Sequence, residues 1–188
     1  AVMCYLYLDK VSFDKTQVAM QTLTVPVGQR AKLILPDGTE VWANSGSKVT
    51  YPSMFGQERN VKVEGEALFY VAKDPEHPFI VTTNNHCVKA LGTIFNVEAY
   101  KGKESIVTLI EGSVKVYEVN KEESGVVLQP NYKLVCNGSL MSVEVANSDV
   151  IEWKDGMIVF TKQSMAEIIG VLQKRFNVTI KVKNNAIN

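Results

Sequence analysis

The sequence contains few of the residues that carry most enzyme chemistry. Its 188 residues include only two histidines and three cysteines, and 20 basic side chains are balanced by 20 acidic ones. A chain without a basic excess lacks the electrostatic footprint of a dedicated nucleic-acid-binding protein. Phosphate-binding loops are absent as well, because the Gly92-Thr93 pair precedes an expected strand and not a helix. These shortages favour a protein that binds over one that catalyses a reaction.

The three cysteines are Cys4, Cys87 and Cys136. Because three is an odd number, internal disulfides cannot use all of them. Two interpretations stay open: buried side chains that behave as small apolar groups, or a Cys87–Cys136 disulfide in an oxidising compartment. Their spacing matches no zinc-binding motif.

The two histidines, His77 and His86, do not form a metal-binding pattern. Such a site on strands needs several histidines and a carboxylate, and the sequence has no His-x-His pair. His86 precedes Cys87, but neighbours in a strand point to opposite faces and so cannot act as a nucleophile and its base. We expect no catalytic, metal-binding or cofactor-binding residue.

Carboxylate pairs for glycoside hydrolysis are the enzymatic alternative. Glutamates lie on several expected strands or turns: Glu64, Glu66, Glu98, Glu104 and Glu111. The favoured interpretation places them on the solvent-facing side of half-buried strands.

From Val25 onward, short apolar segments alternate with turn residues. In LILPDGTEVW, Pro36 presets the backbone angle of a tight turn and Gly38 supplies its positive φ, so a hairpin is expected. Strand patterns then recur roughly every 8 to 12 residues up to Val145, without helical periods between them. This spacing predicts a mainly β domain, either an antiparallel β-sandwich or a β-solenoid-like fold.

Residues within segment 59–73 alternate in character. Val61 and Val63 are expected on one face and Lys62 and Glu64 on the other, and Gly65 is expected to introduce a bulge or a bend. Large aromatic side chains are expected to anchor the core or its layers, with a tryptophan anchoring the connector that follows. These fold anchors are Trp42, Tyr51, Phe55, Phe69, Phe95 and, in the connector, Trp153.

The last part of the chain changes to a mixed pattern. Ser164 and Glu167 form a capping box, apolar residues then recur at helical spacing, and Asn177 is a suitable helix terminator. Strands are expected on both sides of this helix, at 157–161 and 178–183. The prediction is a small β-α-β (α+β) C-terminal unit, which is too small to form a core alone. It must dock on the β domain or be the first half of a longer domain.

These patterns divide the chain into three expected parts. A leading segment covers residues 1–24, the β domain covers 25–145, and a connector with the partial C-terminal unit covers 146–188. The first eight residues are mostly apolar but fall short of the ~20 that span a membrane. They fit either a leading strand or the trimmed end of an apolar segment upstream, and Ala1 as first residue suggests a cut.

Four segments follow one another along the chain, and their order matters for the family resemblance: VPVGQRAKLILPDGTEVWANSGSKVTYPSMF, VKVEGEALFYVAKDPEHPFIVTT, VKALGTIFNVEAY and VTLIEGSVKV. Together they resemble the periplasmic domain of FecR-type anti-sigma factors, in the version common in Bacteroidetes. The tail IEWKDGMIVFTKQSMAEIIGVLQKRFNVTIKV is similar to the start of the small C-terminal domain of that version. The resemblance covers roughly residues 25 to 183. WANSGS and QPNYKLVCNG depart from the family pattern at turns or strand ends, which affects local loop shape.

The resemblance implies a non-enzymatic signalling role. Such proteins hold an extracytoplasmic-function sigma factor through a cytoplasmic segment, cross the inner membrane once, and receive a signal in the periplasm. The signal comes from the signalling domain of an outer-membrane TonB-dependent transducer. The chain would then be the periplasmic domain of an inner-membrane protein, without a cofactor and without nucleic acid as a partner.

A partner surface is hypothesised on the alternating segment at the C-terminal end. Its residues are Thr179, Ile180, Lys181, Val182 and Lys183. A strand edge here could accept a partner strand by β-augmentation, and its lysines would steer the encounter. Equally, the strand could be an internal member of a fuller sheet whose lysines protect an edge.

Two other functions stay open at this point. One is a carbohydrate-binding or carbohydrate-acting extracytoplasmic β module, and the other is a structural or assembly protein of the cell surface. A membrane span and a cytoplasmic region upstream would favour the regulator, whereas a cleavable signal peptide would favour the carbohydrate module.

Overall fold

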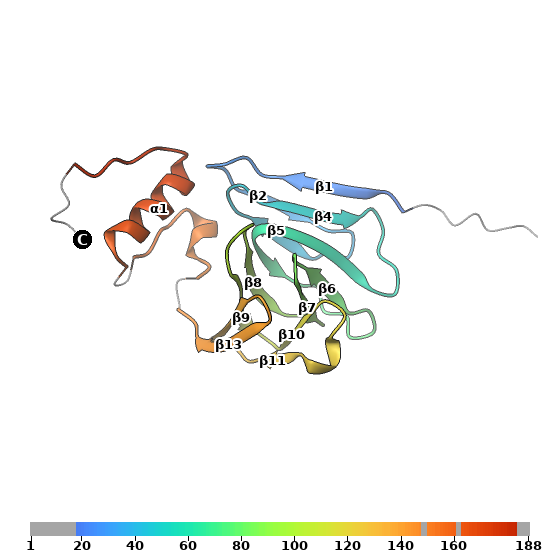
Figure 1. Ribbon diagram of the computed structural model, residues 1–188. Coiled ribbons are helices and arrows are strands. Elements are labelled where there is room, and N and C mark those ends of the chain that lie inside the picture. Colours follow the sequence, from blue (N-terminus) through green and yellow to red (C-terminus); the bar gives the residue numbers. More distant parts are fainter. Residues whose placement is uncertain (1–17, 148–149, 161–162, 184–188) are drawn as a thin grey trace, which may run out of the picture.

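The computed structural model describes residues 18–147, 150–160 and 163–183. Within them, strands form one continuous sheet that folds into two layers sharing the long strand β5, Arg59–Tyr70 (Figure 1). Neighbouring strands are antiparallel except β5 and β6, which are parallel. The mainly β prediction is confirmed, and the two layers nearly close into a barrel.

The first layer, called sheet A, has the order β1-β4-β5-β6-β7-β10-β11. Its strands besides β5 are β1 (Met20–Thr24), β4 (Lys48–Pro52), β6 (Phe79–Thr82), β7 (His86–Ala90), β10 (Val114–Glu118) and β11 (Val126–Leu128). The second layer, sheet B, has the order β2-β3-β5-β8-β9-β12-β13. Its strands besides β5 are β2 (Ala31–Ile34), β3 (Glu40–Ala43), β8 (Ile94–Ala99), β9 (Ser105–Glu111), β12 (Tyr132–Asn137) and β13 (Leu140–Val145).

The hairpin expected around the Pro-Asp-Gly-Thr turn is formed by β2 and β3, with Leu33 opposite Val41. Gly38 has a φ of 85°, which glycine adopts at no steric cost. The Asp37 carboxylate accepts a hydrogen bond from the Thr39 amide at 3.0 Å, as aspartate does in tight turns. Local turn chemistry therefore fixes this part of the fold.

Strand β5 passes from one layer to the other at Gly65. Its first half pairs with β4 in sheet A, and its second half pairs with β8 in sheet B from Gly65 onward. Gly65 has a φ of 101°, and a Cβ there would lie 2.7 Å from the Ser47 Cα. The expected bend is thus found at Gly65, where two backbones approach too closely for any side chain.

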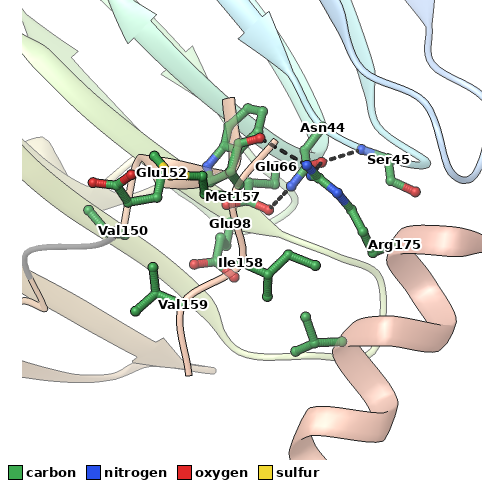
Figure 2. A pocket seen from close by; sticks show the side chains of 12 residues that line it. Asn44, Ser45, Glu66, Glu98, Val150, Glu152, Met157, Ile158, Val159 and Arg175 are labelled. Carbon is green, nitrogen blue, oxygen red and sulfur yellow. Dashed lines mark hydrogen bonds between the residues drawn. The ribbon is translucent and has the colours of Figure 1, made fainter. Parts of the chain in front are cut away.

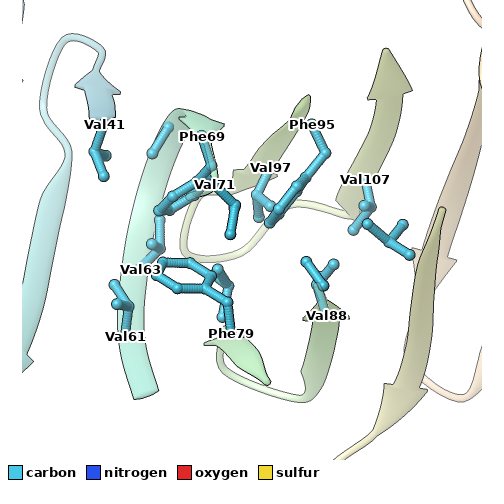
Figure 3. Close-up of a cluster of buried hydrophobic side chains, with 14 of the residues drawn as sticks. Val41, Val61, Val63, Phe69, Val71, Phe79, Val88, Phe95, Val97 and Val107 are labelled. Carbon is cyan, nitrogen blue, oxygen red and sulfur yellow. The ribbon is translucent and has the colours of Figure 1, made fainter. Parts of the chain in front are cut away.

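The core lies between the layers, and both inner faces contribute to it (Figure 3). Phe69 stacks on its cross-strand neighbour Phe95 with ring centroids 5.2 Å apart, and the Phe79 ring lies 5.8 Å from Phe69. Tyr51 is also buried in this core, and Phe55 packs against it from the side. Burying one such ring stabilises the fold by roughly 1.5–3 kcal/mol.

Trp42, expected among the core anchors, lies instead on the outer face of sheet B. Its neighbours Val41 and Ala43 point into the core, so alternation turns the indole outward. There the Trp42 Nε1 donates a hydrogen bond to Glu40 Oε1 at 2.5 Å. The Lys32 ammonium lies 5.2 Å from the ring centroid. The half-buried indole therefore packs on its own hairpin.

Cys87 and Cys136 are both free and buried, which contradicts the possible disulfide. Cys136 belongs to the core between the layers, where burial raises the pKa of its thiol to about 11. Cys87 packs with Ile80 and Tyr117 in a separate cluster, because alternation along β7 points it away from that core. Cys4 lies outside the described residues.

The C-terminal helix α1, Met165–Phe176, begins and ends as its sequence indicates. The Ser164 hydroxyl accepts a hydrogen bond from the Glu167 amide, and the Glu167 carboxylate accepts one from the Ser164 amide. Asn177 ends the helix in the left-handed conformation with a φ of 52°. The capping box and the terminator are therefore confirmed.

The strands expected beside this helix are not formed. Residues 157–160 and 178–183 are not in strands, and residue 161 lies outside the described residues. A strand needs a neighbour that accepts and donates backbone hydrogen bonds, whereas the Ile180 amide donates to the Gln173 side chain at 2.8 Å. The observed unit is one helix with extended flanks, preceded by the short 3-10 turn η2, Glu152–Asp155. A second 3-10 turn, η1, covers Glu122–Ser124.

Candidate functional site

The outer face of sheet B carries polar side chains beneath the C-terminal segment. Glu66 lies opposite Glu98, and Asn96 lies on the neighbouring row opposite Leu68. Residues 150–160 and 163–183, here called the C-terminal arm, lie over part of this face. Between the arm and the sheet is a cleft of about 280 Å³ (Figure 2). Its lining includes Asn44, Glu66 and Glu98 from the sheet and Trp153, Met157 and Arg175 from the arm.

Glu66 is the most buried carboxylate of the cleft, with 7% of its surface exposed. Its Oε2 accepts a hydrogen bond from Asn44 Nδ2 at 2.7 Å, and its Oε1 accepts one from Asn96 Nδ2 at 3.2 Å. The expectation that Glu66 faces solvent is wrong, although Glu64 is half exposed as expected. Glu66 lies on the outer face of its sheet, but its carboxylate is held between Asn44 and Asn96 at the bottom of the cleft under the arm.

Two arginines attach the arm to the sandwich. Arg30 Nη1 donates hydrogen bonds to the carbonyl oxygens of Trp153 at 2.6 Å and Lys154 at 2.9 Å. Arg175 Nη2 donates to the same Trp153 carbonyl at 3.2 Å, and its Nη1 donates to Asn44 Oδ1 at 3.4 Å. Figure 2 shows the Arg175 side chain extending from helix α1 toward Asn44. The η2 turn is thus held from both sides.

The charges around Arg175 oppose one another. Burial and the nearby Arg30 guanidinium lower the pKa of Arg175, and the attraction of the Glu66 carboxylate partly offsets them. Like charges that converge on one carbonyl disfavour the contact, whereas the carboxylate favours it. Closure of the arm therefore depends on a balance between these groups.

The turn that precedes β2 completes the contact with the arm. Gly28 donates its amide to Ser45 Oγ at 2.8 Å, and a Cβ on Gly28 would lie 3.6 Å from Asn177 Cβ at the end of helix α1. Behind this turn, the Tyr100 hydroxyl donates to the Ser45 carbonyl at 3.1 Å. Burial, and next the Glu66 charge, raise the pKa of Tyr100, so the phenol stays protonated and serves as a donor.

The arm exposes large apolar side chains before, within and after helix α1. They are Met157, Val159, Phe160, Met165, Val171, Phe176, Val178 and Val182, each between 38% and 61% exposed. None of the arm's described residues is buried. An apolar surface of this kind is typical of a segment that contacts another protein.

The residues of the hypothesised partner surface, Thr179 to Lys183, lie at the end of the arm. Ile180 is half-buried and its four companions are exposed. The structure brings this segment next to helix α1 through the Gln173 side chain, but not into a sheet. Whether it accepts a partner strand stays a prediction.

No group of three or more histidine, cysteine, aspartate or glutamate side chains is placed to hold a metal ion in the described part of the chain. His77 lies at the surface with its Nδ1 2.8 Å from Asp74 Oδ2, and this hydrogen bond lowers the pKa of the Asp74 carboxyl. Across the same described residues, no helix has the length and apolar character needed to span a membrane.

His86 is a buried titratable group, and its burial makes the stability of the fold depend on pH. It is 2% exposed, and burial lowers its pKa, although the Glu118 charge and the Gly138 backbone oppose this effect. The unfolded chain binds a proton at this site below about pH 6.5, whereas the folded chain resists it. Stability is therefore lost as the pH falls from about 6.5 toward the lower pKa of the folded state.

We predict that His86→Gln reduces this loss of stability in acid. The free energy of unfolding, measured by urea titration between pH 7.5 and 5, should fall less steeply than in the wild type. The matched control is His77→Gln, because the His77 side chain is 46% exposed. Equal slopes for His86→Gln and the wild type would contradict the prediction.

A protein-family model and two solved structures that are similar to this chain agree with one another. The model of the FecR protein family matches residues 21–115. Two crystal structures of a candidate anti-sigma factor from Parabacteroides distasonis ATCC 8503, at 2.50 Å and 1.65 Å resolution, superpose with a TM-score of 0.75. Both are 31% identical to this chain. The first match covers 85% of this chain and 76% of the other, and the second covers 84% and 75%. No curated protein matches the chain significantly.

Proposed function

The chain belongs to the FecR family of anti-sigma factors, and from this membership we propose that it is the periplasmic, signal-receiving part of a transmembrane regulator. In this proposal it relays a signal from an outer-membrane TonB-dependent transducer to an extracytoplasmic-function sigma factor. The relay works through protein–protein contacts, and a segment upstream anchors the protein in the inner membrane and holds the sigma factor.

The observation that carries the proposal is the contrast between the two parts of the chain. The β domain has a closely packed core of aromatic and β-branched side chains, whereas the arm exposes apolar side chains and buries none of its described residues. A rigid platform that presents an exposed apolar segment suits recognition of a protein partner. Family membership supports a regulatory role and not an enzymatic one.

The direct test is binding of the isolated signalling domain of the cognate TonB-dependent transducer. Titration of that domain into the purified chain should give saturable, one-to-one binding by calorimetry. A signalling domain from an unrelated transducer is the control for specificity. No binding to the cognate domain, together with binding of an oligosaccharide, would favour the carbohydrate module instead.

Within this function, we predict that Ile180→Pro weakens binding of the transducer domain by at least about tenfold, because proline removes a backbone donor and resists strand pairing. In the structure the Ile180 amide donates to the Gln173 side chain and not to a neighbouring strand, so the segment can rearrange to pair with a partner. Affinity is measured by calorimetry, and circular dichroism checks that the β domain is folded.

The control for this prediction is Ile180→Val, which keeps the amide and a β-branched side chain. It should bind like the wild type. Unchanged affinity for a folded Ile180→Pro variant would remove residues 179–183 from the partner surface, while leaving the relay itself to the titration above.

A further inference from the structure

The C-terminal arm has little of what normally holds a segment in place. None of its described residues is buried. The apolar side chains of helix α1 are half-buried at Ile168, Ile169 and Leu172 and exposed at Met165 and Phe176. A helix of 12 residues without a buried apolar face is marginal in water. Segments with few buried apolar contacts open at free energies below that of global unfolding. The arm is therefore able to open while the sandwich stays folded.

The surface under the arm suits an open state as well as a closed one. A permanently covered sheet face is expected to be apolar, yet Asn44, Glu66 and Glu98 line the cleft under the arm, with Asn96 beside Glu66. Asn44 and Asn96 both donate to Glu66, so these hydrogen bonds remain when the arm leaves. In the closed state, Trp153 Nε1 is buried without a partner among the described groups, which favours opening.

Arg175 is the contact through which helix α1 opposes opening. From the last turn of helix α1, its guanidinium reaches Asn44 on the sandwich and the Trp153 carbonyl on the η2 turn. One side chain thus ties the helix, the η2 turn and the sheet together. The Glu66 carboxylate attracts it, whereas Arg30 shares the Trp153 carbonyl and repels it. Because Arg30 also holds the η2 turn through the Trp153 and Lys154 carbonyls, Arg175 sets how firmly helix α1 is held over the sheet.

We propose that the C-terminal arm is a reversible cover on the outer face of sheet B, and that Arg175 is the latch that holds it closed. Opening separates Trp153 and helix α1 from Asn44 and Glu66 and leaves the β domain unchanged.

The test uses the purified chain and its two tryptophans. In a Trp42→Phe background, Trp153 is the remaining tryptophan, so quenching of its fluorescence by acrylamide reports opening of the arm. Hydrogen exchange followed by mass spectrometry gives a second readout. It compares the amides of helix α1 with those of β5 and β8 in the same molecule.

In the wild type, the amides of helix α1 should exchange at least about tenfold faster than those of β5 and β8. Arg175→Met should accelerate exchange of helix α1 by a further factor of about ten and roughly double the quenching of Trp153, with β5 and β8 unchanged. Arg175→Lys keeps the charge but lacks the planar fork that reaches two acceptors. Its exchange and quenching should therefore lie between those of the wild type and those of Arg175→Met. Lys181→Met removes one positive charge elsewhere on the arm and should match the wild type.

Two results would overturn the proposal. One is exchange of helix α1 only through the global unfolding that also exposes β5 and β8, which needs no variant to detect. The other is an Arg175→Met variant with the exchange and quenching of the wild type. Neither result bears on binding of the transducer domain, and failure of that binding would leave opening of the arm measurable.

Discussion

Replacing Gly65 by alanine is expected to destabilise the β domain severely. Gly65 has a φ of 101°, and an added Cβ would lie 2.5 Å from Ser47 Oγ and 2.7 Å from Ser47 Cα. Because one of these atoms belongs to the backbone of the neighbouring turn, a side-chain rotation cannot relieve the clash. Strained backbone costs about 1–3 kcal/mol and overpacking a further 1–3, so the expected loss is roughly 2–6 kcal/mol. That is a large share of the stability of an ordinary domain.

The matched control for this prediction is Gly38→Ala. Gly38 also has a positive φ, at 85°, but a Cβ there would meet nothing within 4 Å. Gly38→Ala should lower the free energy of unfolding only through the strained backbone, by about 1–2 kcal/mol. Urea unfolding followed by circular dichroism gives both values. If the two variants lose the same stability, the close approach to Ser47 has no energetic weight and the prediction is wrong.

A folded Gly65→Ala variant should also disturb the site. Ser47 Oγ accepts a hydrogen bond from the Glu66 amide at 2.8 Å and donates one to the Glu66 carbonyl at 3.0 Å. Moving Ser47 therefore moves the backbone of Glu66, whose carboxylate lies beside Arg175. The bend that joins the two layers and the placement of the buried carboxylate depend on the same close contact.

Local signals in the sequence predicted local structure well. The turn at Gly38 and the capping box at Ser164 were both readable, because each depends on residues within four positions of one another. Alternation also placed Val61 and Val63 on one face of β5, and the structure buries that face in the core. In these places the chain determines its conformation with little help from distant segments.

Features that depend on distant segments could not be predicted in the same way. The alternating residues 178–183 have strand character, but a strand also needs a paired neighbour, which alternation does not reveal. Glu66 occupies an outward position, and its burial comes from Asn44, Asn96 and the cleft under the arm. Sequence alternation assigns a face of the sheet and cannot say what covers that face.

Arg59 is a buried residue whose importance was not apparent from the sequence. It begins β5 and is 2% exposed. Its guanidinium pairs with the Asp37 carboxylate at 2.8 Å and lies 5.4 Å from the centre of the Phe79 ring. It also donates to the carbonyl oxygens of Ala72 and His77 at 2.8 and 2.7 Å. One side chain thus joins the β2–β3 turn to the loop before β6.

We predict that Arg59→Met lowers the free energy of unfolding by about 3–5 kcal/mol, because it leaves a largely buried carboxylate without its cation. Methionine retains the apolar stem, so the loss reports mainly on charge and hydrogen bonds. Arg59→Lys should recover only part of it, since an ammonium cannot reproduce the planar fork that reaches several acceptors. Lys62→Met, on the exposed side of the same strand, should change the stability by less than about 0.5 kcal/mol.

The double variant Arg59→Met with Asp37→Asn separates charge from packing. If the uncompensated carboxylate causes the loss, neutralising Asp37 restores part of the stability, and the coupling free energy is at least about 1 kcal/mol. Additive losses would instead mean that the carbonyl contacts to the loop before β6 carry the effect. An Arg59→Met variant as stable as Lys62→Met would refute the structural role of this ion pair, because a buried carboxylate cannot lose its cation at no energetic cost.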